Sequence, residues 1–349
     1  MPACNTLRMR SLVLPLITLL SVGAVAWAGE PRVAGPRTII VALDGSGEFT
    51  SIQEAVDSAK KGDTVFLKPG AYPQDLTIHS KEAIKLVGAG VDEVTLLGHR
   101  ERVGVLHVGK WPYGAVDIEI AGLTVNEHGG HAVGIFNGKR IVLRGLRVKG
   151  MLFGQQVQDV RIEDCVIGGS ETTGVQFADT QAVLIGNIIH DNDHGVNVAG
   201  KSEVRLERNI ITRNLFEAVV IGDSAKAVLI SNTLVKNGGG AAFLGSSHSE
   251  VSGNIVGLNT VGFVIAPSSQ TTLSFNGLFN KEGNYLKAGS PPTLAPELKS
   301  ASDIAADPRF VDAEHDDFRL RRDTTLVNKG PFSFLGAQPP LSAPPSRRQ

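Results

Sequence analysis

Val204-Arg205-Leu206-Glu207-Arg208-Asn209-Ile210-Ile211 is one copy of a pattern that recurs between residues 164 and 280. Asparagines return with this pattern after 22 or 23 residues, at Asn187, Asn209, Asn232, Asn254 and Asn276. A second series follows five residues behind each of the first four, at Asn192, Asn214, Asn237 and Asn259. A fixed period of this length is typical of a solenoid, in which each repeat buries its apolar face against its neighbours.

Two solenoids have a period near this length, and the second half of the repeat distinguishes them. Val204, Leu206 and Asn209 also match a leucine-rich repeat, which would continue with leucines at helical spacing. This chain continues with short β-branched runs such as Gly195-Val196-Asn197-Val198. We therefore predict an all-β, right-handed parallel β-helix of roughly nine coils of about 22 residues, with coils ~4.8 Å apart.

The turns and the interior of the predicted coils can be read from the same alignment. Glycine or aspartate takes the place of the turn asparagine in the earlier coils, at Gly88, Gly122, Gly145 and Asp164. Gly, Asn and Asp tolerate left-handed backbone angles, so we expect the turn asparagines to adopt them. An apolar residue recurs at one place in each coil and is predicted to form the interior: Val125, Val148, Ile167, Ile189, Ile211, Leu234, Val256 and Leu278.

The N-terminus has the features of a secretory signal peptide. Arg8 and Arg10 precede an apolar run over residues 12–26, and Ala26-Trp27-Ala28 is a small-x-small cleavage site. The run is too short and wrongly flanked for a membrane span, although a retained N-terminal anchor is the alternative. We predict that residues 1–28 are a signal peptide and that the protein is secreted or periplasmic, with no membrane partner after cleavage. Cys165 is the only cysteine beyond residue 28, so no internal disulfide is expected.

The remaining chain is predicted to have four parts. Residues 29–63 hold an N-terminal strand near Thr38 and a capping helix, whose start is the capping box Ser51-Ile52-Gln53-Glu54 and whose stop is Gly62. Such a helix would cover the open end of the strand stack. Residues 64–280 form the parallel β-helix, residues 281–336 a C-terminal closing segment, and residues 337–349 a proline-rich disordered tail.

The charge of the chain argues against nucleic acid as a partner. The full chain has 34 Lys and Arg against 35 Asp and Glu, a formal charge of −1. Without Arg8 and Arg10 there are 32 basic residues (34 − 2) against 35 acidic ones, a formal charge of −3. A nucleic-acid-binding surface would show a basic excess.

For the oligomeric state of the protein, we expect a monomer.

With its asparagine-bearing turns, the chain resembles the secreted right-handed β-helix superfamily typified by pectate lyases. This resemblance implies a polysaccharide partner, but the superfamily contains lyases, epimerases, hydrolases, esterases and non-enzymes. The stretches over residues 41–56 and 63–72 are similar to the start of pectin methylesterases. The Q-D-T-L and D-F-x-F-G motifs of that family are absent, so neither of its catalytic aspartates has a matching position. Asp307-Pro308-Arg309-Phe310 with Asp317-Phe318-Arg319-Leu320 looks like the close of many bacterial β-helix proteins.

Polar outward positions concentrate on the coils from His131 to Glu217, where the resemblance also implies a saccharide groove. Alignment on the turn puts one set of residues just before the Gly/Ala strand of successive coils: His131, Lys149, Thr173, His194 and Glu217. A second set points outward two places into that strand: Gly134, Leu152, Gln176, Asn197, Val220 and Phe243. Both sets become apolar or small toward the C-terminus, the first with Gly240 and Val261 and the second with Val264.

His194 and Glu217 lie one coil apart and are the candidate catalytic pair. A carboxylate beside an imidazole orients the ring and increases its basicity, as a general base requires. Arg213 is the third catalytic candidate, because a guanidinium binds a uronate carboxylate through two parallel hydrogen bonds. Lys149, Gln176, Asn197 and His131 are the candidate substrate-binding residues. The alternative is that all of these are solvated turn residues on a polar face.

Asp191 and Asp193 are a candidate Ca²⁺ site, since Ca²⁺ takes several carboxylate and carbonyl oxygens. No other cofactor is predicted. His131 and His194 are three coils apart, roughly 14 Å, and cannot share a metal. Trp111 and Tyr113 are candidates for stacking on sugars, with packing of a loop against a coil as the alternative.

Three functional hypotheses follow from these residues. The first is an exported carbohydrate-active protein that acts on an acidic polysaccharide as a lyase or a uronate epimerase. The second is a non-catalytic saccharide-binding or surface protein that uses the same groove. The third is a pectin esterase, which the missing aspartates count against.

Overall fold

The computed structural model describes residues 35–98 and 104–341. The described residues from Pro36 onward belong to one compact unit, and everything below concerns that unit. The predicted signal peptide lies outside the described residues. In the described ranges, no helix is both long and apolar enough to cross a membrane.

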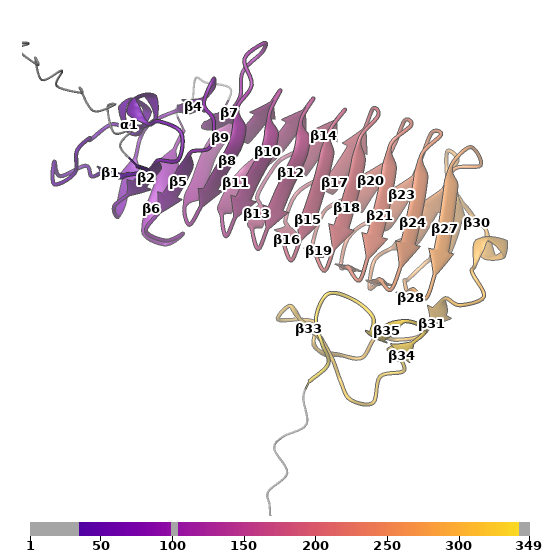
Figure 1. Ribbon diagram of the computed structural model, residues 1–349. Coiled ribbons are helices and arrows are strands. Elements are labelled where there is room, and N and C mark those ends of the chain that lie inside the picture. Colours follow the sequence, from indigo (N-terminus) through magenta and orange to yellow (C-terminus); the bar gives the residue numbers. More distant parts are fainter. Residues whose placement is uncertain (1–34, 99–103, 342–349) are drawn as a thin grey trace, which may run out of the picture. The chain divides into compact units, whose positions relative to one another are not determined.

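Parallel strands of successive coils pair in register and form a right-handed parallel β-helix, as the period predicts (Figure 1). One face, the long face, is an 11-stranded sheet. Its strands are, in order, β1 (Thr38–Val41), β2 (Thr64–Leu67), β5 (Lys85–Gly88), β8 (Val116–Ala121), β10 (Lys139–Arg144), β12 (Gln158–Glu163), β15 (Gln181–Ile185), β18 (Glu203–Glu207), β21 (Lys226–Ile230), β24 (His248–Ser252) and β27 (Gln270–Ser274).

The other two faces carry shorter ladders, with β9 (Thr124–Phe136) and β11 (Arg147–Gln155) running through both. The short face continues with β13 (Val166–Gly168), β16 (Ile188–His190), β19 (Ile210–Thr212), β22 (Thr233–Val235), β25 (Ile255–Gly257) and β28 (Gly277–Phe279). The front face continues with β14 (Thr173–Ala178), β17 (His194–Ala199), β20 (Glu217–Ile221), β23 (Gly239–Phe243), β26 (Val261–Ile265) and β29 (Gly283–Lys287). The first coils contribute β3 (Gly70–Tyr72), β4 (Leu76–Ile78), β6 (Val94–Leu97) and β7 (Leu106–Val108).

The predicted number of coils, roughly nine, was too low, because the long face of the described chain has 11 strands. The strand β1 pairs in parallel with β2, with Thr38 opposite Thr64, although helix α1 separates them in sequence. The first coils therefore belong to the stack without carrying the asparagine that marks the later ones.

Helix α1 (Ile52–Ser58) lies at the N-terminal end of the stack, and it begins as the capping box predicts. The Ser51 side chain accepts a hydrogen bond from the backbone N–H of Glu54 at 3.3 Å. Ile52, Ala55 and Val56 are buried against the first strands, but the helix ends at Ser58, before the predicted stop at Gly62. The apolar face of this short helix covers the first coil.

Both asparagine series form ladders inside the coils, but their backbone differs from the prediction. Asn209 illustrates the bonding, since its N–H and Nδ2 both donate to Asn232 Oδ1 at 3.0 Å while its own Oδ1 accepts from Asn187. The left-handed residue is the one before each asparagine of the first series: Gly186, Arg208, Ser231, Gly253 and Phe275. Gly122, Gly145 and Asp164 are the left-handed residues of the earlier coils, which carry no asparagine after them. The equivalent of Asn187 in the previous coil is therefore Cys165, whose N–H donates to Asn187 Oδ1 at 2.9 Å, and not Asp164.

The predicted interior column is confirmed. Its eight members are at most 1% exposed: Val125, Val148, Ile167, Ile189, Ile211, Leu234, Val256 and Leu278. They belong to one continuous apolar core that runs from the first coil to Tyr285. Because each coil contributes to the same core, the turns and outward positions can vary without loss of the fold.

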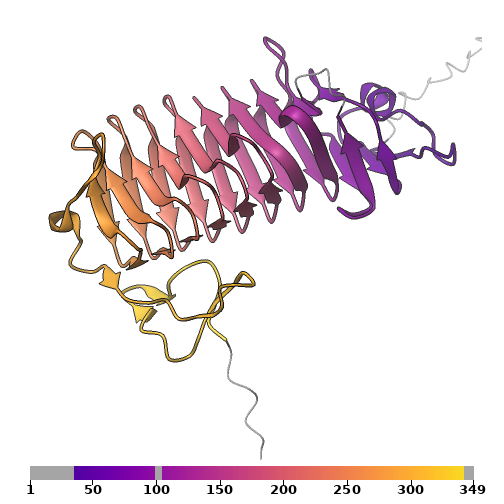
Figure 2. The same cartoon turned by 180° about the vertical axis from the view of Figure 1, so that it is seen from behind.

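The closing segment folds back along the short face of the solenoid (Figure 2). It contains β30 (Thr293–Leu294), the 3₁₀ turn Pro296–Leu298, β31 (Ile304–Ala305), and the antiparallel pairs β32 (Phe310–Asp312) with β33 (Asp317–Leu320) and β34 (Val327–Lys329) with β35 (Phe332–Phe334). Phe310, Phe318 and Leu326 pack on outward side chains of the short face, among them Ile210 and Ile255. The chain stays hydrogen-bonded as far as Leu341, whose N–H donates to Leu320 O at 3.0 Å, so the predicted disordered tail is bonded over its first residues.

Candidate functional site

The front face places Gln176 and Asn197 beside each other on neighbouring coils, as predicted. Both side chains are half-buried, and Val220 follows in the same column. The column then becomes apolar through Ala242, Val264 and Leu286, which pack together on the outside of the coils. Leu152 and Phe243 were predicted to belong to this column, but both point into the core. The residues that occupy the column are their neighbours Phe153 and Ala242.

Lys149 does not lie in the column of His194, where the alignment placed it. Strand β11 has an irregularity between Lys149 and Leu152, so that Met151 faces His131 and Lys149 pairs with Asn126 instead. A shift of one residue in a strand moves its side chains to the opposite face, which is why a count from the turn fails here. Lys149 is exposed and still lines a cleft together with His131.

The structure brings His194 and Glu217 together. Nδ1 of His194 lies 3.2 Å from Glu217 Oε2, and the two side chains are 32% and 31% exposed. The ring stacks on Phe216, with centroids 5.1 Å apart and planes at 29°. Nδ1 is buried and its angle to Glu217 falls outside hydrogen-bond geometry, with no other partner among the described residues. This packing leaves Nε2 as the ring nitrogen that can meet a substrate.

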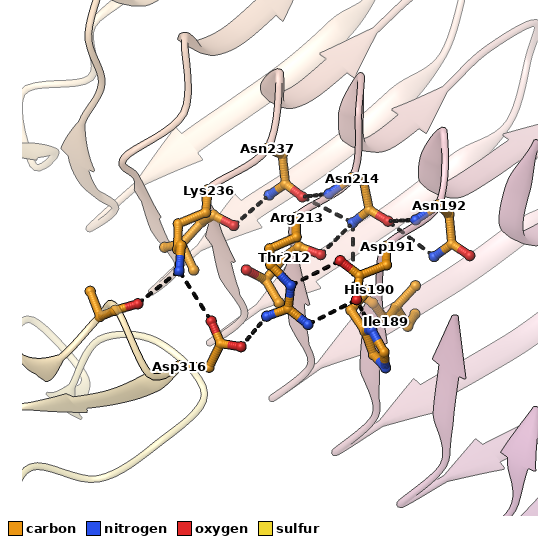
Figure 3. A network of polar contacts seen from close by, with 12 residues as sticks. Ile189, His190, Asp191, Asn192, Thr212, Arg213, Asn214, Lys236, Asn237 and Asp316 are labelled. Carbon is orange, nitrogen blue, oxygen red and sulfur yellow. Dashed lines mark hydrogen bonds and ion pairs between the residues drawn. The ribbon is translucent and has the colours of Figure 1, made fainter. Parts of the chain in front are cut away.

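Arg213 is held by carboxylates of the protein itself (Figure 3). Its Nε and Nη2 donate to the two oxygens of Asp191 at 2.9 and 3.0 Å, and its Nη1 contacts Asp316 of the closing segment. Lys236 contacts the other oxygen of Asp316 at 3.3 Å and donates to Ala313 O at 2.9 Å. Arg213 is therefore engaged in joining the turn to the closing segment, and the predicted binding of a uronate carboxylate would require these bonds to break.

Asp191 and Asp193 do not fit the predicted Ca²⁺ site. Both oxygens of Asp191 accept from Arg213, and Oδ2 also lies 2.6 Å from His190 Nδ1. The guanidinium and, after it, His190 hold the pKa of Asp191 below its usual range. Ca²⁺ takes six to eight oxygen ligands, whereas residues 35–98 and 104–341 contain no group of three or more His, Cys, Asp or Glu side chains arranged to hold a metal.

A cleft of about 1020 Å³ lies at the edge between the front and short faces. His131, Lys149 and Asp191 line it, together with Glu171 and His190 of neighbouring turns. A Cβ at Gly150 would lie 2.4 Å from a carboxylate oxygen of Glu127, so glycine there gives Glu127 its place in the cleft wall. The cleft is adjacent to the His194 column, because β17 pairs with β14 and β14 with β11.

Sequence reasoning missed a group of rings on the N-terminal coils of the front face. His107, Phe136 and Phe153 lie there next to His131, and all four side chains are half-exposed. Their spacing follows from strand pairing across three coils and leaves no signal in any single repeat. Trp111 and Tyr113, in contrast, were singled out, and they are 71% and 60% exposed, so packing against a coil does not account for them.

A separate shallow groove of about 790 Å³ lies on the outer side of the long face. Its charged side chains face one another across coils, as in the contact of Lys226 Nζ with Glu203 Oε1 at 2.8 Å. Exposed pairs of this kind contribute little to stability. None of the predicted site residues lies in this groove.

The fold and the two asparagine ladders define the chain as a right-handed parallel β-helix protein. Residues 150–291 match the family described as "Right handed beta helix region". Among solved structures, the chain is similar to the pectate lyase Pel9A, with a TM-score of 0.54 and 12% sequence identity over 89% of this chain and 98% of that one. The pectin-lyase-like fold implied by the sequence is thereby confirmed.

Two curated plant proteins share a short segment with this chain. The chain is 33% identical over 76 residues to "Putative pectinesterase/pectinesterase inhibitor 22" of Arabidopsis thaliana. It is 37% identical over 80 residues to "Probable pectinesterase/pectinesterase inhibitor 6" of the same organism. Each match covers 20% of this chain and 14% of the relative, so the chain spans a small part of the length of these relatives.

Proposed function

We propose that the protein is an exported, carbohydrate-active β-helix protein that binds an acidic polysaccharide across its front face and acts on it as a lyase or an epimerase. The observation that carries this proposal is the 3.2 Å separation of His194 Nδ1 and Glu217 Oε2. Gln176 and Asn197 stand half-exposed beside the pair and can donate to and accept from sugar hydroxyls. The fold similarity to a pectate lyase supports the same class of activity.

In the proposed reaction His194 is the general base. Its Nε2 takes the proton from the sugar carbon next to the carboxylate, while the Glu217 carboxylate beside Nδ1 stabilises the imidazolium that forms. In a lyase, the electron pair of the broken C–H bond forms a C=C bond, and the bond to the glycosidic oxygen breaks. That oxygen then takes up a proton from solvent water. In an epimerase, the carbon takes a proton from solvent water on the opposite face of the ring.

An acidic polysaccharide carries a carboxylate on successive sugars, and a cation of the protein can bind one of them. Arg213 is engaged by Asp191 and Asp316. Lys149 is exposed in the adjacent cleft and is the free cation among the predicted site residues. We assign to Lys149 the binding of a uronate carboxylate on a neighbouring sugar, with His131 beside it in the cleft wall.

A second candidate function is non-catalytic binding of a saccharide on the same face. The observation that favours it is the engagement of Arg213, which removes the strongest carboxylate-binding side chain from the reaction. The same groove then holds the polymer without proton transfer. A pectin esterase is not proposed, because no pair of aspartates matches that family.

Turnover assays with two matched controls distinguish the two functions. The purified protein is incubated with polygalacturonate, alginate and glycosaminoglycans, with and without Ca²⁺. Elimination is followed by the absorbance of the unsaturated uronate, and epimerisation by deuterium uptake at the sugar carbon in D₂O. We expect Glu217→Gln to lower kcat by roughly 10²–10⁴-fold, and His194→Gln to lower it at least as much. His248→Gln and Glu250→Gln, on the outer side of the long face, should leave kcat unchanged. If no polymer is turned over, the binding function replaces the catalytic one.

A further inference from the structure

Four aromatic rings form a continuous half-exposed surface on the front face, N-terminal to the His194–Glu217 pair. The ring centroids of His107 and Phe136 are 5.8 Å apart, those of Phe136 and Phe153 are 5.8 Å apart, and those of Phe153 and His131 are 5.1 Å apart. The last pair is stacked, with planes at 28°. We call these four residues the aromatic platform.

Gly134 makes the platform possible. It lies between His107 and Phe153 in the outward column of the front face. A Cβ at this position would stand 2.6 Å from Phe136 Cε2 and 2.8 Å from His107 Cδ2. Glycine therefore lets rings from neighbouring coils meet over its backbone, and a larger residue would separate them.

The platform borders a cleft of about 640 Å³ that includes Trp111. The hairpin around Trp111 is closed by the bond from the Lys110 N–H to Tyr113 O at 2.6 Å, and it holds the indole 71% exposed. The rim is polar and comes from helix α1 and the first coils: Gln53, Asp57, Thr77, His79 and Lys110. Exposed aromatic faces surrounded by hydrogen-bonding groups match a ligand that is apolar on one side and polar at its edge.

We propose that the aromatic platform and Trp111 form a saccharide-binding subsite, which stacks the C–H faces of pyranose rings and extends the front-face groove toward the N-terminus. The class of ligand rests on the proposed function, whereas the site itself rests on the rings. His131 lines both this cleft and the one that contains Lys149, so the two clefts are adjacent. Phe153 also pairs in register with Gln176, which in turn pairs with Asn197.

His131 presents a ring face to the cleft rather than a charge. Burial and, after it, the neighbouring His107 hold the pKa of His131 below its usual range, so this imidazole is neutral at pH 7. Phe153 lies two strand spacings, about 10 Å, from Asn197. His194 begins the same strand as Asn197, three residues before it. A chain of sugars bound at His194 therefore reaches the platform with its next residues, and the subsite acts on polymers and not on single sugars.

Tryptophan fluorescence gives a direct test, because the chain has two tryptophans, Trp27 and Trp111. In the full chain carrying Trp27→Phe, Trp111 is the only tryptophan, and excitation at about 295 nm selects its emission. Polygalacturonate and alginate are the acidic probes, and dextran is the neutral one. We expect a saturable change in emission with at least one acidic probe, and its Kd should rise about tenfold in Phe153→Ala. Phe279→Ala, which removes an exposed phenylalanine from the C-terminal coil, should leave Kd unchanged.

Failure of the subsite can be separated from failure of the proposed reaction. His194→Gln should abolish turnover and leave the emission titration unchanged. Turnover without a saturable response at Trp111 would overturn the platform and keep the reaction. A saturable response that Phe153→Ala does not weaken would also overturn the platform. Binding that is weakened by Phe153→Ala, without turnover of any polymer, supports the platform and contradicts the proposed reaction. If no probe changes the Trp111 emission and no polymer is turned over, both proposals are contradicted.

Discussion

Arg213 donates two parallel hydrogen bonds to Asp191 of the preceding coil, and its Nη1 contacts Asp316 of the closing segment. The two turn residues have the same left-handed backbone, with φ of 54° in each. Their side chains therefore leave the coils side by side. Lys236 of the following coil contacts the same Asp316, which completes a row of alternating charges. Arg213, predicted as a catalytic residue, thus fixes the closing segment to the solenoid.

We expect Arg213→Ala to loosen the closing segment more than it destabilises the coils. The network is partly exposed, so the loss in free energy of unfolding should be about 1 kcal/mol. Hydrogen exchange should rise over residues 310–335, and Asp316→Ala should produce the same pattern. Arg140→Ala is the matched control, because Arg140 forms an equivalent two-bond contact with Asp117 on neighbouring coils. If Arg140→Ala increases exchange in the closing segment equally, the docking role is wrong.

The first asparagine ladder ends on a buried carboxylate, which predicts an unusual dependence of stability on pH. Asp303 Oδ1 accepts from the N–H and Nδ2 of Asn276 at 2.8 and 3.0 Å, and Oδ2 accepts from the Tyr285 hydroxyl at 3.0 Å. Burial nevertheless raises the pKa of Asp303, and burial also raises that of Tyr285. A carboxyl with a raised pKa binds its proton more tightly when folded, so its contribution to stability is full below the unfolded pKa, near 3.9. This contribution is lost as the pH rises through the folded pKa.

Asp303→Asn should therefore stabilise the protein at pH 7, by on the order of 1 kcal/mol. The amide keeps an acceptor for Asn276 and offers a donor to Tyr285, and it carries no charge. Urea unfolding should be measured from pH 3.5 to pH 8. The free energy of unfolding of Asp303→Asn should increase relative to that of the wild type as the pH rises. Asn254→Asp, which adds a charge to the same ladder, should destabilise at pH 7. A variant with an unchanged pH profile would show that the Asp303 carboxyl is not the titrating group.

Asn232→Ala should be among the most destabilising single substitutions in the coils. Asn232 is fully buried, its Oδ1 accepts two bonds from Asn209, and its Nδ2 donates to Leu206 O at 2.9 Å. Each buried group left without a partner costs about 1–3 kcal/mol, so we expect a loss of about 3 kcal/mol or more in the free energy of unfolding. Asn197→Ala, on the half-exposed front face, should change it by about 0.5 kcal/mol or less. Equal losses in the two variants would contradict a structural role for the ladder.

Cys165 should report on opening of the coils. Burial raises the pKa of its thiol to about 11, and the thiolate is the form that reacts. Its Sγ is enclosed between coils, with the Leu146 N–H donating to it at 3.5 Å. We expect iodoacetamide to label Cys165 only above the urea midpoint of unfolding, as read by mass spectrometry of its peptide. Rapid labelling of the native protein would show that this coil opens locally.

The repeat was sufficient to predict the fold, because each coil pairs with the next through the same spacing. The interior column was correct for the same reason. Phe153 was missed because the irregularity in β11 shifts one strand by one residue, which the period does not record. The contact between Arg213 and Asp316 joins residues 103 positions apart, one of them outside the repeat, so no local pattern could reveal it.

In the earlier coils, which lack the ladder asparagine, the residue equivalent to it was predicted one position too early. Asp164 was chosen, for example, where the equivalent residue is Cys165. A left-handed residue and a ladder asparagine are adjacent in sequence and prefer the same few residue types, so spacing alone does not separate them. The proximity of His194 and Glu217, in contrast, needed only one coil of spacing, and Nδ1 and Oε2 lie 3.2 Å apart in the structure.

The left-handed position before each ladder asparagine is occupied by glycine, arginine, serine and phenylalanine at Gly186, Arg208, Ser231 and Phe275. The bend there is held by the bonds of the following asparagine and does not depend on the bent residue's own chemistry. Sequence drift can therefore replace these residues while the backbone stays in place. For protein engineering, Gly186, Arg208 and Ser231 offer three neighbouring, at least partly exposed sites at intervals of ~4.8 Å, on which charges or attachment groups can be arranged to match a chosen polymer or mineral surface.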